Sequence, residues 1–210
     1  MKKKVIKILK KVGAILTNDH FVLTSGRHTN AYINPDKILP HPEICEQLSK
    51  MIAQKYKNQD IEIVIGPAYG GIIFSQWVAY HLSKINKKKI LSIFTEKSPE
   101  KHQLLERGFD KLIKNKKVLI VEDITATGSS VIKVIKSSKK AGAIIKGIGV
   151  IVNRDPKNVT STIFEGIPFT SLVVFEIKSY NERDCPYCIK KIPINIFIGH
   201  GKSYLERHKK

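Results

Sequence analysis

The chain has 210 residues, 42% of them hydrophobic and 26% charged, a composition typical of one soluble globular domain and not of a disordered or fibrous protein. Its 37 Lys and Arg residues against 18 Asp and Glu residues give a formal net charge of +19. That excess favours an anionic partner, such as nucleic acid, an anionic membrane or a phosphate-rich small molecule. Only five of the basic residues are Arg, however, the side chain that reads nucleic-acid bases. We therefore interpret the scattered lysines mainly as solvated surface.

The sequence indicates neither a membrane segment nor a signal peptide. Lysines interrupt the apolar residues at the start of the chain, and no stretch approaches the ~20 apolar residues of a membrane helix. Three cysteines are too few for a disulfide framework. We expect a cytoplasmic protein that binds neither a membrane nor nucleic acid.

The apolar pattern predicts helices and strands in alternation. Residues 3–17 have apolar positions at helical spacing and predict an amphipathic helix, followed by a mixed segment over 18–40 with a turn at Ser25-Gly26. A second helix begins at Pro42 and is expected to reach Tyr56. Beyond it, short β-branched runs predict strands over 61–65, 90–94, 117–121, 147–152 and 171–175, with helices over 72–84 and 130–140.

Short apolar strands that alternate with helices indicate an α/β protein with a mainly parallel sheet covered on both faces. In such a sheet the ligand lies beyond the carboxyl ends of the strands. The informative residues should therefore follow the predicted strands, at 66–71, 95–102, 122–130 and 153–155.

The segment from Val118 to Ser130, VLIVEDITATGSS, carries the strongest chemical signal. A predicted buried strand ends in Glu122 and Asp123, and a loop of small and hydroxyl residues then leads into a helix. Backbone N–H groups at a helix N-terminus favour a phosphate, whereas two carboxylates repel a phosphate and accept hydrogen bonds from hydroxyl groups. A phosphate beside a diol indicates a phosphorylated ribose.

This segment resembles the signature with which type I phosphoribosyltransferases bind 5-phosphoribosyl 1-diphosphate (PRPP): a hydrophobic run, two acids, and Thr-Gly before a Ser or Thr. Other segments are similar to those of the orotate phosphoribosyltransferases within that superfamily. They are the N-terminal segment 20–34 (HFVLTSGRHTNAYIN), the pyrophosphate loop 66–72 (GPAYGGI), the hood loop 97–102 and the tail around 185–193. The resemblance covers nearly the whole chain.

The resemblance implies the type I phosphoribosyltransferase fold, a mainly parallel central sheet flanked by helices with a small N-terminal hood region. A single domain would span residues 1–210, with the hood at 1–40, the core at 41–178 and a C-terminal tail at 179–210. The implied reaction transfers the 5-phosphoribosyl group from PRPP to orotate. Its products are orotidine 5′-monophosphate and pyrophosphate, and it belongs to de novo pyrimidine (UMP) biosynthesis.

The family's substrate contacts carry over to the matching positions of this chain. The carboxylates of Glu122 and Asp123 would hold the ribose hydroxyls. The residues implied to bind PRPP are Glu122, Asp123, Thr125, Ala126, Thr127, Gly128, Ser129, Ser130, Tyr69, Gly70, Gly71 and Lys97. Those implied to hold orotate are Ser25, Tyr32, Ile33, Thr127 and Arg154, with Ile33 packed on the face of the base.

The resemblance also implies Asp123, Lys97, Lys101 and His102 as catalytic residues, the last three neutralising the leaving pyrophosphate from the hood loop. Mg²⁺ is the expected cofactor, held mainly through PRPP with no direct protein ligand. The expected assembly is a homodimer whose hood loops are shared across the subunits.

Two segments depart from the family pattern. Many orotate enzymes have Arg-Lys-x-x-Lys-x-His in the hood loop, whereas this chain has Glu96 at the first position and Glu100 at the second Lys position, with Lys101 one step later. Gly70 stands where those enzymes carry a Lys. Whether Lys97 or Lys101 is the main cation stays open.

Two other functions stay open beside transfer to orotate. One is a phosphoribosyltransferase for another base, a purine or uracil. The other is a non-catalytic PRPP sensor that regulates transcription, which would use the net charge of +19 on nucleic acid. Against the sensor, the family match begins so early that we expect no room for an added DNA-binding domain.

Cys185 and Cys188 have the spacing of half a zinc site, but the sequence contains no second such pair. His200 or His208 would complete a site only by chance, so we favour a reduced structural tail over metal binding or redox chemistry. His20 and His28, on either side of the Ser25-Gly26 turn, are weaker candidates for a ligand contact.

Overall fold

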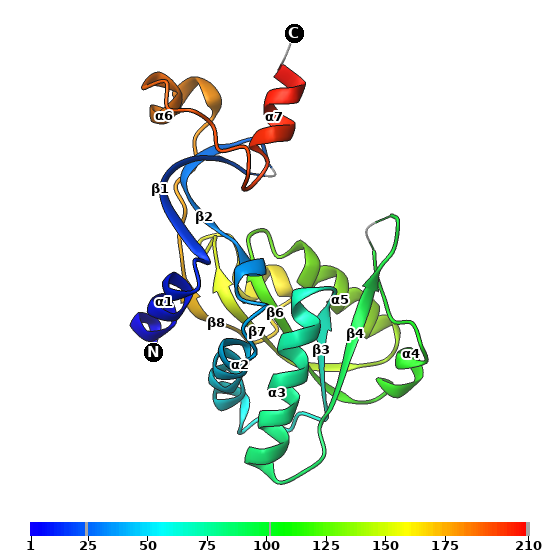
Figure 1. The fold of residues 1–210 in the computed structure, drawn as a ribbon. Helices are drawn as coiled ribbons and strands as arrows, with labels where there is room; N and C mark the ends of the chain where they lie inside the picture. The colour runs from blue at the N-terminus through cyan, green and yellow to red at the C-terminus, as the bar shows by residue number, and fades with distance from the viewer. Residues whose placement is uncertain (24, 101, 209–210) are drawn as a thin grey trace.

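The protein is seen here in a computed structural model that describes residues 1–23, 25–100 and 102–208. Lys101, one of the catalytic candidates, lies outside the described residues. Two sheets are present (Figure 1). The smaller is an antiparallel pair of β1 (Ile15–Val22) and β2 (His28–Ile33). The larger has the strand order β5-β4-β3-β6-β7-β8.

Five of the six strands in the larger sheet are parallel, and only β5 at its edge is antiparallel, to β4. The strands are β3 (Ile63–Pro67), β4 (Leu91–Lys97), β5 (Gln103–Leu104), β6 (Lys117–Thr125), β7 (Ile144–Asn153) and β8 (Phe169–Val174). Each of the five predicted strands is present in this sheet, and the α/β class with a mainly parallel sheet is confirmed.

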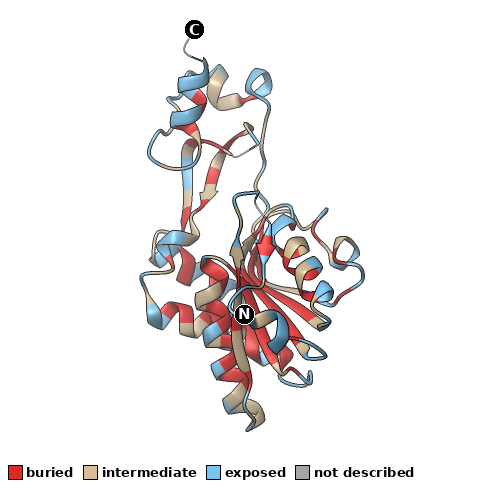
Figure 2. Ribbon diagram, turned by 90° about the vertical axis from the view of Figure 1, so that its right-hand side faces the viewer, coloured by how far each residue is buried: buried red, intermediate tan, exposed pale blue. Residues whose placement is uncertain are grey.

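The middle of the sheet has continuous apolar runs, such as Val118–Val121 of β6, because the sheet is buried on both faces (Figure 2). In β6, Leu119 and Val121 belong to one hydrophobic cluster, and Val118 and Ile120 belong to another. The first cluster includes side chains of helices α1, α2 and α3, and the second includes those of α5. Neighbouring residues of one strand thus contribute to cores on opposite sides of the sheet.

The longer helices are α1 (Lys2–Lys11), α2 (Pro42–Tyr56), α3 (Gly70–Asn86), α5 (Ser129–Lys140) and α7 (Gly201–His208). Two short α-helices are α4 (Phe109–Leu112) and α6 (Pro186–Ile189). Three 3₁₀ segments are η1 (Pro35–Lys37), η2 (Ser161–Phe164) and η3 (Glu182–Asp184). The helices predicted over 42–56, 72–84 and 130–140 correspond to α2, α3 and α5.

The helix predicted over residues 3–17 is wrong in its second half. Helix α1 ends at Lys11, and Gly13 then adopts a left-handed backbone with φ of +69° that interrupts a right-handed helix. Ile15 and Leu16 belong to β1 instead, where they pair with Ile33 and Tyr32. Their apolar spacing fitted a helix and a strand equally well, and the pairing with β2 decided between the two.

The C-terminal segment lies against the β1–β2 hairpin, far from it in sequence but beside it in space (Figure 1). His28 and Tyr180 exchange two backbone hydrogen bonds of 2.8 Å, and the N–H of Asn195 donates to the carbonyl of His20. We call the β1–β2 hairpin together with residues 179–208 the distal lobe, because it projects from the six-stranded sheet (Figures 1 and 2). The expected boundaries of hood, core and tail stay a prediction.

Candidate active site

The strand order creates a switch point between β3 and β6. These two strands are neighbours, but the chain continues from β3 to β4 on one side, and from β6 to β7 on the other. The helices that follow them, α3 and α5, pack on opposite faces of the sheet. A crevice therefore opens where the loops after β3 and β6 diverge, which is the place where such sheets bind ligands.

Two carboxylates stand at the end of β6 in this crevice. Glu122 is 7% exposed, and its Oε1 accepts a hydrogen bond from the N–H of Asp123 at 3.1 Å. Asp123 Oδ1 accepts from the N–H of Ile124. Among the described residues, no basic side chain forms an ion pair with either carboxylate.

Burial without a cation disfavours charge on this pair. Burial raises the pKa of Glu122 well above its ordinary value, and the adjacent Asp123 raises it further. Burial also raises the pKa of Asp123, while hydrogen bonds from Glu122 and from the Ile124 N–H oppose part of that rise. Both groups would become more acidic beside a divalent cation or hydroxyl donors.

The loop after β6 forms a small hollow of about 230 Å³ lined by Glu122, Arg154 and the residues from Ile124 to Val131. Thr125 Oγ1 accepts from the Gly128 N–H at 3.1 Å, which folds the loop back toward the start of α5. Gly128 has a φ of +74°, a left-handed conformation that favours glycine. Thr127, Ser129 and Ser130 are exposed at the mouth, so their hydroxyls and the helix N-terminus face an incoming anion.

The loop after β3 approaches the acid pair closely. A Cβ added to Gly70 would lie 2.0 Å from Asp123 Oδ2, and one added to Gly66 would lie 2.0 Å from the Gly71 carbonyl oxygen. Both glycines are therefore required by the packing of this loop. The absence of the family's Lys at position 70 has a physical reason here, because any side chain would displace Asp123 or the loop. The side chain of Tyr69, in contrast, is 84% exposed.

A second hollow, of about 270 Å³, joins the first through Arg154 and Ala126, which line both. Ser25 also lines it, so the structure brings together two of the residues implied to hold orotate. Arg154 is held by its backbone N–H, which donates to the Thr125 carbonyl at 2.9 Å. Its buried Nε has no hydrogen-bond partner among the described residues, which leaves a donor free for a ligand carboxylate.

Ile33 and Tyr32 are not part of this hollow among the described residues. Ile33 is 1% exposed and belongs to the core cluster beneath β1, so the expectation that it packs on the face of a base is not met in this conformation. Tyr32 packs instead on Phe21, with ring centroids 5.7 Å apart. Packing decides this, because Ile33 belongs to the cluster that includes side chains of α1, α2 and α3.

The hood loop joins β4 to β5, which pair antiparallel. Ser98 and His102 close it through the Ser98 N–H, which donates to the His102 carbonyl at 3.1 Å. Lys97 and His102 are exposed and line neither hollow. Glu96, at the family's Arg position, pairs with Arg107 and so carries no free charge toward a substrate.

Sequence reasoning missed Ser179 and Glu176, which line the second hollow beside Ser25. Arg27 holds this part of the tail beside the second hollow, because its Nε donates to Ser179 Oγ at 2.9 Å. The two residues are 152 positions apart in the sequence. It also missed Asp36, whose charge acts on Asp123. No local pattern marks these residues, since each reaches the site only through tertiary packing.

The fold and the crevice correspond to those of phosphoribosyltransferases. The family model of the phosphoribosyl transferase domain matches residues 34–162. A solved structure of the Mycobacterium tuberculosis orotate phosphoribosyltransferase in complex with 5-phospho-α-D-ribosyl 1-diphosphate superposes with a TM-score of 0.59 at 14% identity, covering 83% of this chain and 90% of that one. The orotate phosphoribosyltransferase of Francisella tularensis gives a TM-score of 0.62 at 18% identity over 98% of each chain.

Sequence similarity is stronger than these structural likenesses suggest. The orotate phosphoribosyltransferase of Caldanaerobacter subterraneus subsp. tengcongensis is 36% identical over 193 residues, which are 92% of this chain and 95% of that protein. The chain belongs to the orotate phosphoribosyltransferase family. Among the described residues, no helix combines the length and apolar character that crossing a membrane requires.

Proposed function

We propose that this site transfers the 5-phosphoribosyl group of PRPP to orotate, forming orotidine 5′-monophosphate and pyrophosphate in pyrimidine biosynthesis. The observation that carries the proposal is the pair of buried Glu122 and adjacent Asp123, which has no cationic partner among the described residues and stands beside a loop suited to a phosphate. Membership of the orotate phosphoribosyltransferase family supports the same reaction.

The 5′-phosphate of PRPP occupies the hollow of about 230 Å³ after β6. Backbone N–H groups at the start of α5, and the hydroxyls of Thr125, Thr127, Ser129 and Ser130, donate to its oxygens, while Ala126 and Gly128 contribute backbone only. The carboxylates of Glu122 and Asp123 accept from the ribose 2′- and 3′-hydroxyls. Those hydrogen bonds replace the water that each carboxylate lost on burial.

The pyrophosphate lies along the loop after β3, where Tyr69, Gly70 and Gly71 present backbone N–H groups. Gly70 allows this approach because the space of a side chain is already occupied by Asp123. The site's oxygen donors suit Mg²⁺, which would be held mainly through PRPP and would balance the charge of the leaving group when bound. Asp123, at the junction of the two loops, orients the ribose relative to the pyrophosphate.

Orotate binds in the second hollow, with its carboxylate on the guanidinium of Arg154, whose buried Nε has no other partner among the described residues. Ser25 and Thr127 add hydroxyl contacts. Tyr32 lies close enough to Arg154 to act on its charge, and adds a further contact to the base. A ring nitrogen of orotate attacks C1 of the ribose as the bond to pyrophosphate breaks, so the site mainly binds, orients and excludes water.

Arg154 is the only basic side chain among the described residues that line the two hollows, and we assign it to orotate, so charge that develops on the pyrophosphate needs further cations. Lys97, Lys101 and His102 belong to the hood loop, whose described residues line neither hollow. We therefore propose that the site is completed by closure of the hood loop, and that in a homodimer the loop of one subunit serves the crevice of the other.

A steady-state assay with PRPP and a panel of orotate, uracil, adenine and hypoxanthine tests the proposal. We expect turnover with orotate alone, and Arg154→Lys should raise the KM for orotate more than the KM for PRPP. Turnover of a purine or uracil but not of orotate would replace the proposal with a different base specificity. Steeply salt-dependent DNA affinity without turnover would support a PRPP sensor instead.

A further inference from the structure

Four potential metal ligands meet inside the distal lobe. His20 lies in β1 and His28 in β2, while Cys185 and Cys188 flank the start of α6. Nε2 of His20, Nδ1 of His28 and the two Sγ atoms all lie within 4.8 Å of one another. His20 and Cys185 are separated by 165 positions in sequence, so the cluster exists only because the tail folds onto the hairpin.

The distances fit a tetrahedral metal site. Both Sγ atoms lie 3.7 Å from His20 Nε2, and Cys188 Sγ lies 3.3 Å from His28 Nδ1. Ligands at the usual Zn–N and Zn–S bond lengths of roughly 2.0–2.3 Å stand roughly 3.3–3.8 Å apart at the corners of a tetrahedron. The two imidazole nitrogens, at 2.8 Å, are closer than that. A small rotation of either ring would admit an ion.

His20 already has the orientation that a metal-binding histidine needs. Its Nδ1 lies 2.8 Å from the carbonyl oxygen of Ile192, an acceptor only, so Nδ1 carries the proton and Nε2 turns an unshared pair toward the cluster. Metal-bound histidines commonly have such a carbonyl partner on the second nitrogen. His28 is held by its backbone exchange with Tyr180, and the Tyr204 ring packs edge-on against it at 4.9 Å.

The burial of the cluster also favours a metal. His20, His28 and Cys185 are 1%, 0% and 0% exposed, and both cysteines are free thiols. Two thiolates balance the charge of a divalent ion, so binding of the ion leaves no net charge in the interior. Each cysteine releases its proton to solvent, and both histidines bind as neutral imidazoles.

We propose that His20, His28, Cys185 and Cys188 bind one Zn²⁺ in a closed Cys₂His₂ site that joins the β1–β2 hairpin to the C-terminal tail. Two sulfur and two nitrogen ligands in a tetrahedral arrangement are typical of structural zinc. The sequence expectation of an unmetallated tail rested on the missing second cysteine pair, and the hairpin histidines take its place. His200 and His208, the candidates nearest in sequence, are not among the four ligands.

The site has a clear structural task, because the tail has little apolar core of its own. Ile189 and Phe197 are 70% and 89% exposed, and the cluster is where the tail and the hairpin bury side chains against each other. The same tail carries Ser179, which lines the hollow proposed for orotate. The metal would therefore fix the position of one wall of that hollow, in addition to stabilising the distal lobe.

Metal content of the full chain, purified and kept under reducing conditions, is the first test. We expect close to one Zn²⁺ per chain by elemental analysis, and Co²⁺ exchanged into the site should show the tetrahedral spectrum with thiolate-to-cobalt charge transfer. Cys188→Ser should lose the metal, and Cys188→His, which restores a ligand, should retain it. Cys45→Ala and His41→Gln are matched controls that remove a cysteine and a histidine elsewhere, and both should keep full occupancy.

A second measurement holds even if Cys188→Ser folds poorly. Chelation of Zn²⁺ from the wild-type chain should open residues 179–208 to limited proteolysis while the six-stranded core resists, and added Zn²⁺ should restore protection. The proposal is overturned if the folded wild-type chain binds neither Zn²⁺ nor Co²⁺ at micromolar concentration. It is equally overturned if zinc content is unchanged in Cys188→Ser, or if the cobalt spectrum lacks the thiolate band.

Discussion

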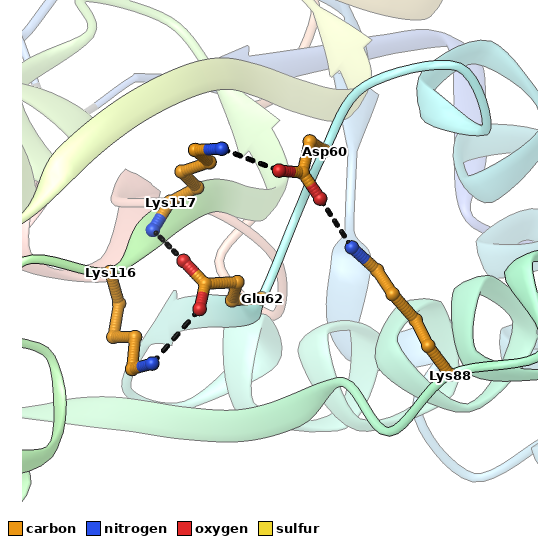
Figure 3. A network of polar contacts seen from close by, with 5 residues as sticks. All are labelled: Asp60, Glu62, Lys88, Lys116 and Lys117. Atoms are coloured by element: carbon orange, nitrogen blue, oxygen red, sulfur yellow. Dashed lines mark hydrogen bonds and ion pairs between the residues drawn. The ribbon is translucent and has the colours of Figure 1, made fainter.

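Two pairs of carboxylates stand at opposite ends of the strands in the six-stranded sheet. We call the side where the parallel strands begin the amino edge and the side where they end the carboxyl edge. Asp60 and Glu62 precede β3 at the amino edge, where three lysines surround them (Figure 3). Lys88 and Lys117 pair with the two oxygens of Asp60, and Lys116 pairs with Glu62 at 2.9 Å. Glu122 and Asp123 end β6 at the carboxyl edge, without such partners among the described residues.

The pKa values of these Asp and Glu residues are therefore shifted in opposite directions at the two edges. Hydrogen bonds from Lys117 and Lys88 lower the pKa of Asp60 to about 2, and the Lys117 N–H with the Lys116 ammonium lowers the pKa of Glu62. Burial raises the pKa values of Glu122 and Asp123. The amino-edge carboxylates are satisfied by the protein itself, whereas the carboxyl-edge pair is left for a ligand to satisfy.

The comparison shows that size does not identify the site. The hollow at the amino edge has a volume of about 480 Å³, larger than the hollow of about 230 Å³ beside Glu122. Its two carboxylates are already paired with three of the lysines that line it, so a cationic ligand would have to break ion pairs to bind there. The smaller hollow has exposed hydroxyls and, among the described residues, carboxylates without a cationic partner, which is the chemistry that a phosphorylated sugar requires.

The largest expected difference between the edges is in activity. Asp123→Asn should lower kcat/KM for PRPP by about 10- to 150-fold, because a hydrogen bond to a charged group is worth roughly 1.5–3 kcal/mol. Asp60→Asn is the matched control and should leave kcat/KM unchanged. If a steady-state assay gave equal effects for the two substitutions, the absence of a cationic partner would not mark Asp123 as part of the active site.

The close approach of the two loops can be tested at Gly70. Gly70→Ala should raise the KM for PRPP about tenfold, since overpacking costs roughly 1–3 kcal/mol and the added Cβ would collide with Asp123 Oδ2. A double variant with Asp123→Asn should be less impaired than the product of the single effects, because both act at one contact. If the effects of Gly70→Ala and Asp123→Asn multiplied in the double variant, the loops after β3 and β6 would act independently.

The source of the cation for the leaving pyrophosphate can be tested among the lysines. Lys101→Ala should lower kcat about tenfold, the equivalent of ~1.4 kcal/mol, with little change in PRPP affinity, if it meets developing charge. Lys88→Ala, at the amino edge, should leave kcat unchanged. A more severe loss in Lys97→Ala than in Lys101→Ala would assign the main role to Lys97.

Stability should change in opposite directions at the two edges. Glu122→Gln should raise the midpoint of thermal unfolding at pH 7 by about 2–4 °C, the shift that ~1 kcal/mol produces at this size. The folded-state pKa of Glu122 is raised, so the carboxylate costs stability only above its unfolded pKa of roughly 4.3. The gain should therefore vanish at pH values below about 4. A gain that persists in acid would have another cause.

The smallest effect is expected at Asp60, which is exposed and screened by solvent. Asp60→Asn should lower the unfolding midpoint slightly at neutral pH, and less at high salt. The folded-state pKa of Asp60 is lowered, so its contribution is present above roughly pH 4 and is lost as the pH falls through about 2. Thermal unfolding of the variant and the wild type across this range measures the loss. A midpoint that rises in the variant would contradict the pairing in Figure 3.

The predicted elements that held were those with one consistent pattern. Helix α2 matches its expected bounds at Pro42 and Tyr56, and the run over 117–121 belongs to β6. The prediction failed over residues 12–17, where the apolar spacing allowed a helix, and it gave no strand in the mixed segment 18–40, where β1 ends and β2 lies. Residues from Ile15 onward form a strand because they pair with β2, and a pairing partner cannot be inferred from a local pattern.

Local sequence determined which segments are buried and which residues carry chemistry. Continuous apolar runs such as Val118–Val121 favour a sheet covered on both faces, and the acid pair with its hydroxyl loop predicted a ribose phosphate site. These features depend on neighbours in sequence, so they can be read without the fold.

Only the tertiary structure decided which distant groups meet. It brought Gly70 against Asp123, gave Asp60 and Glu62 three lysine partners between them, and left Glu122 with none among the described residues. It also placed His20 and His28 beside two cysteines of the tail, where the sequence alone suggested an incomplete metal site. The physical reason is that burial follows from local apolar pattern, whereas contact between segments depends on strand order and on how the chain closes on itself.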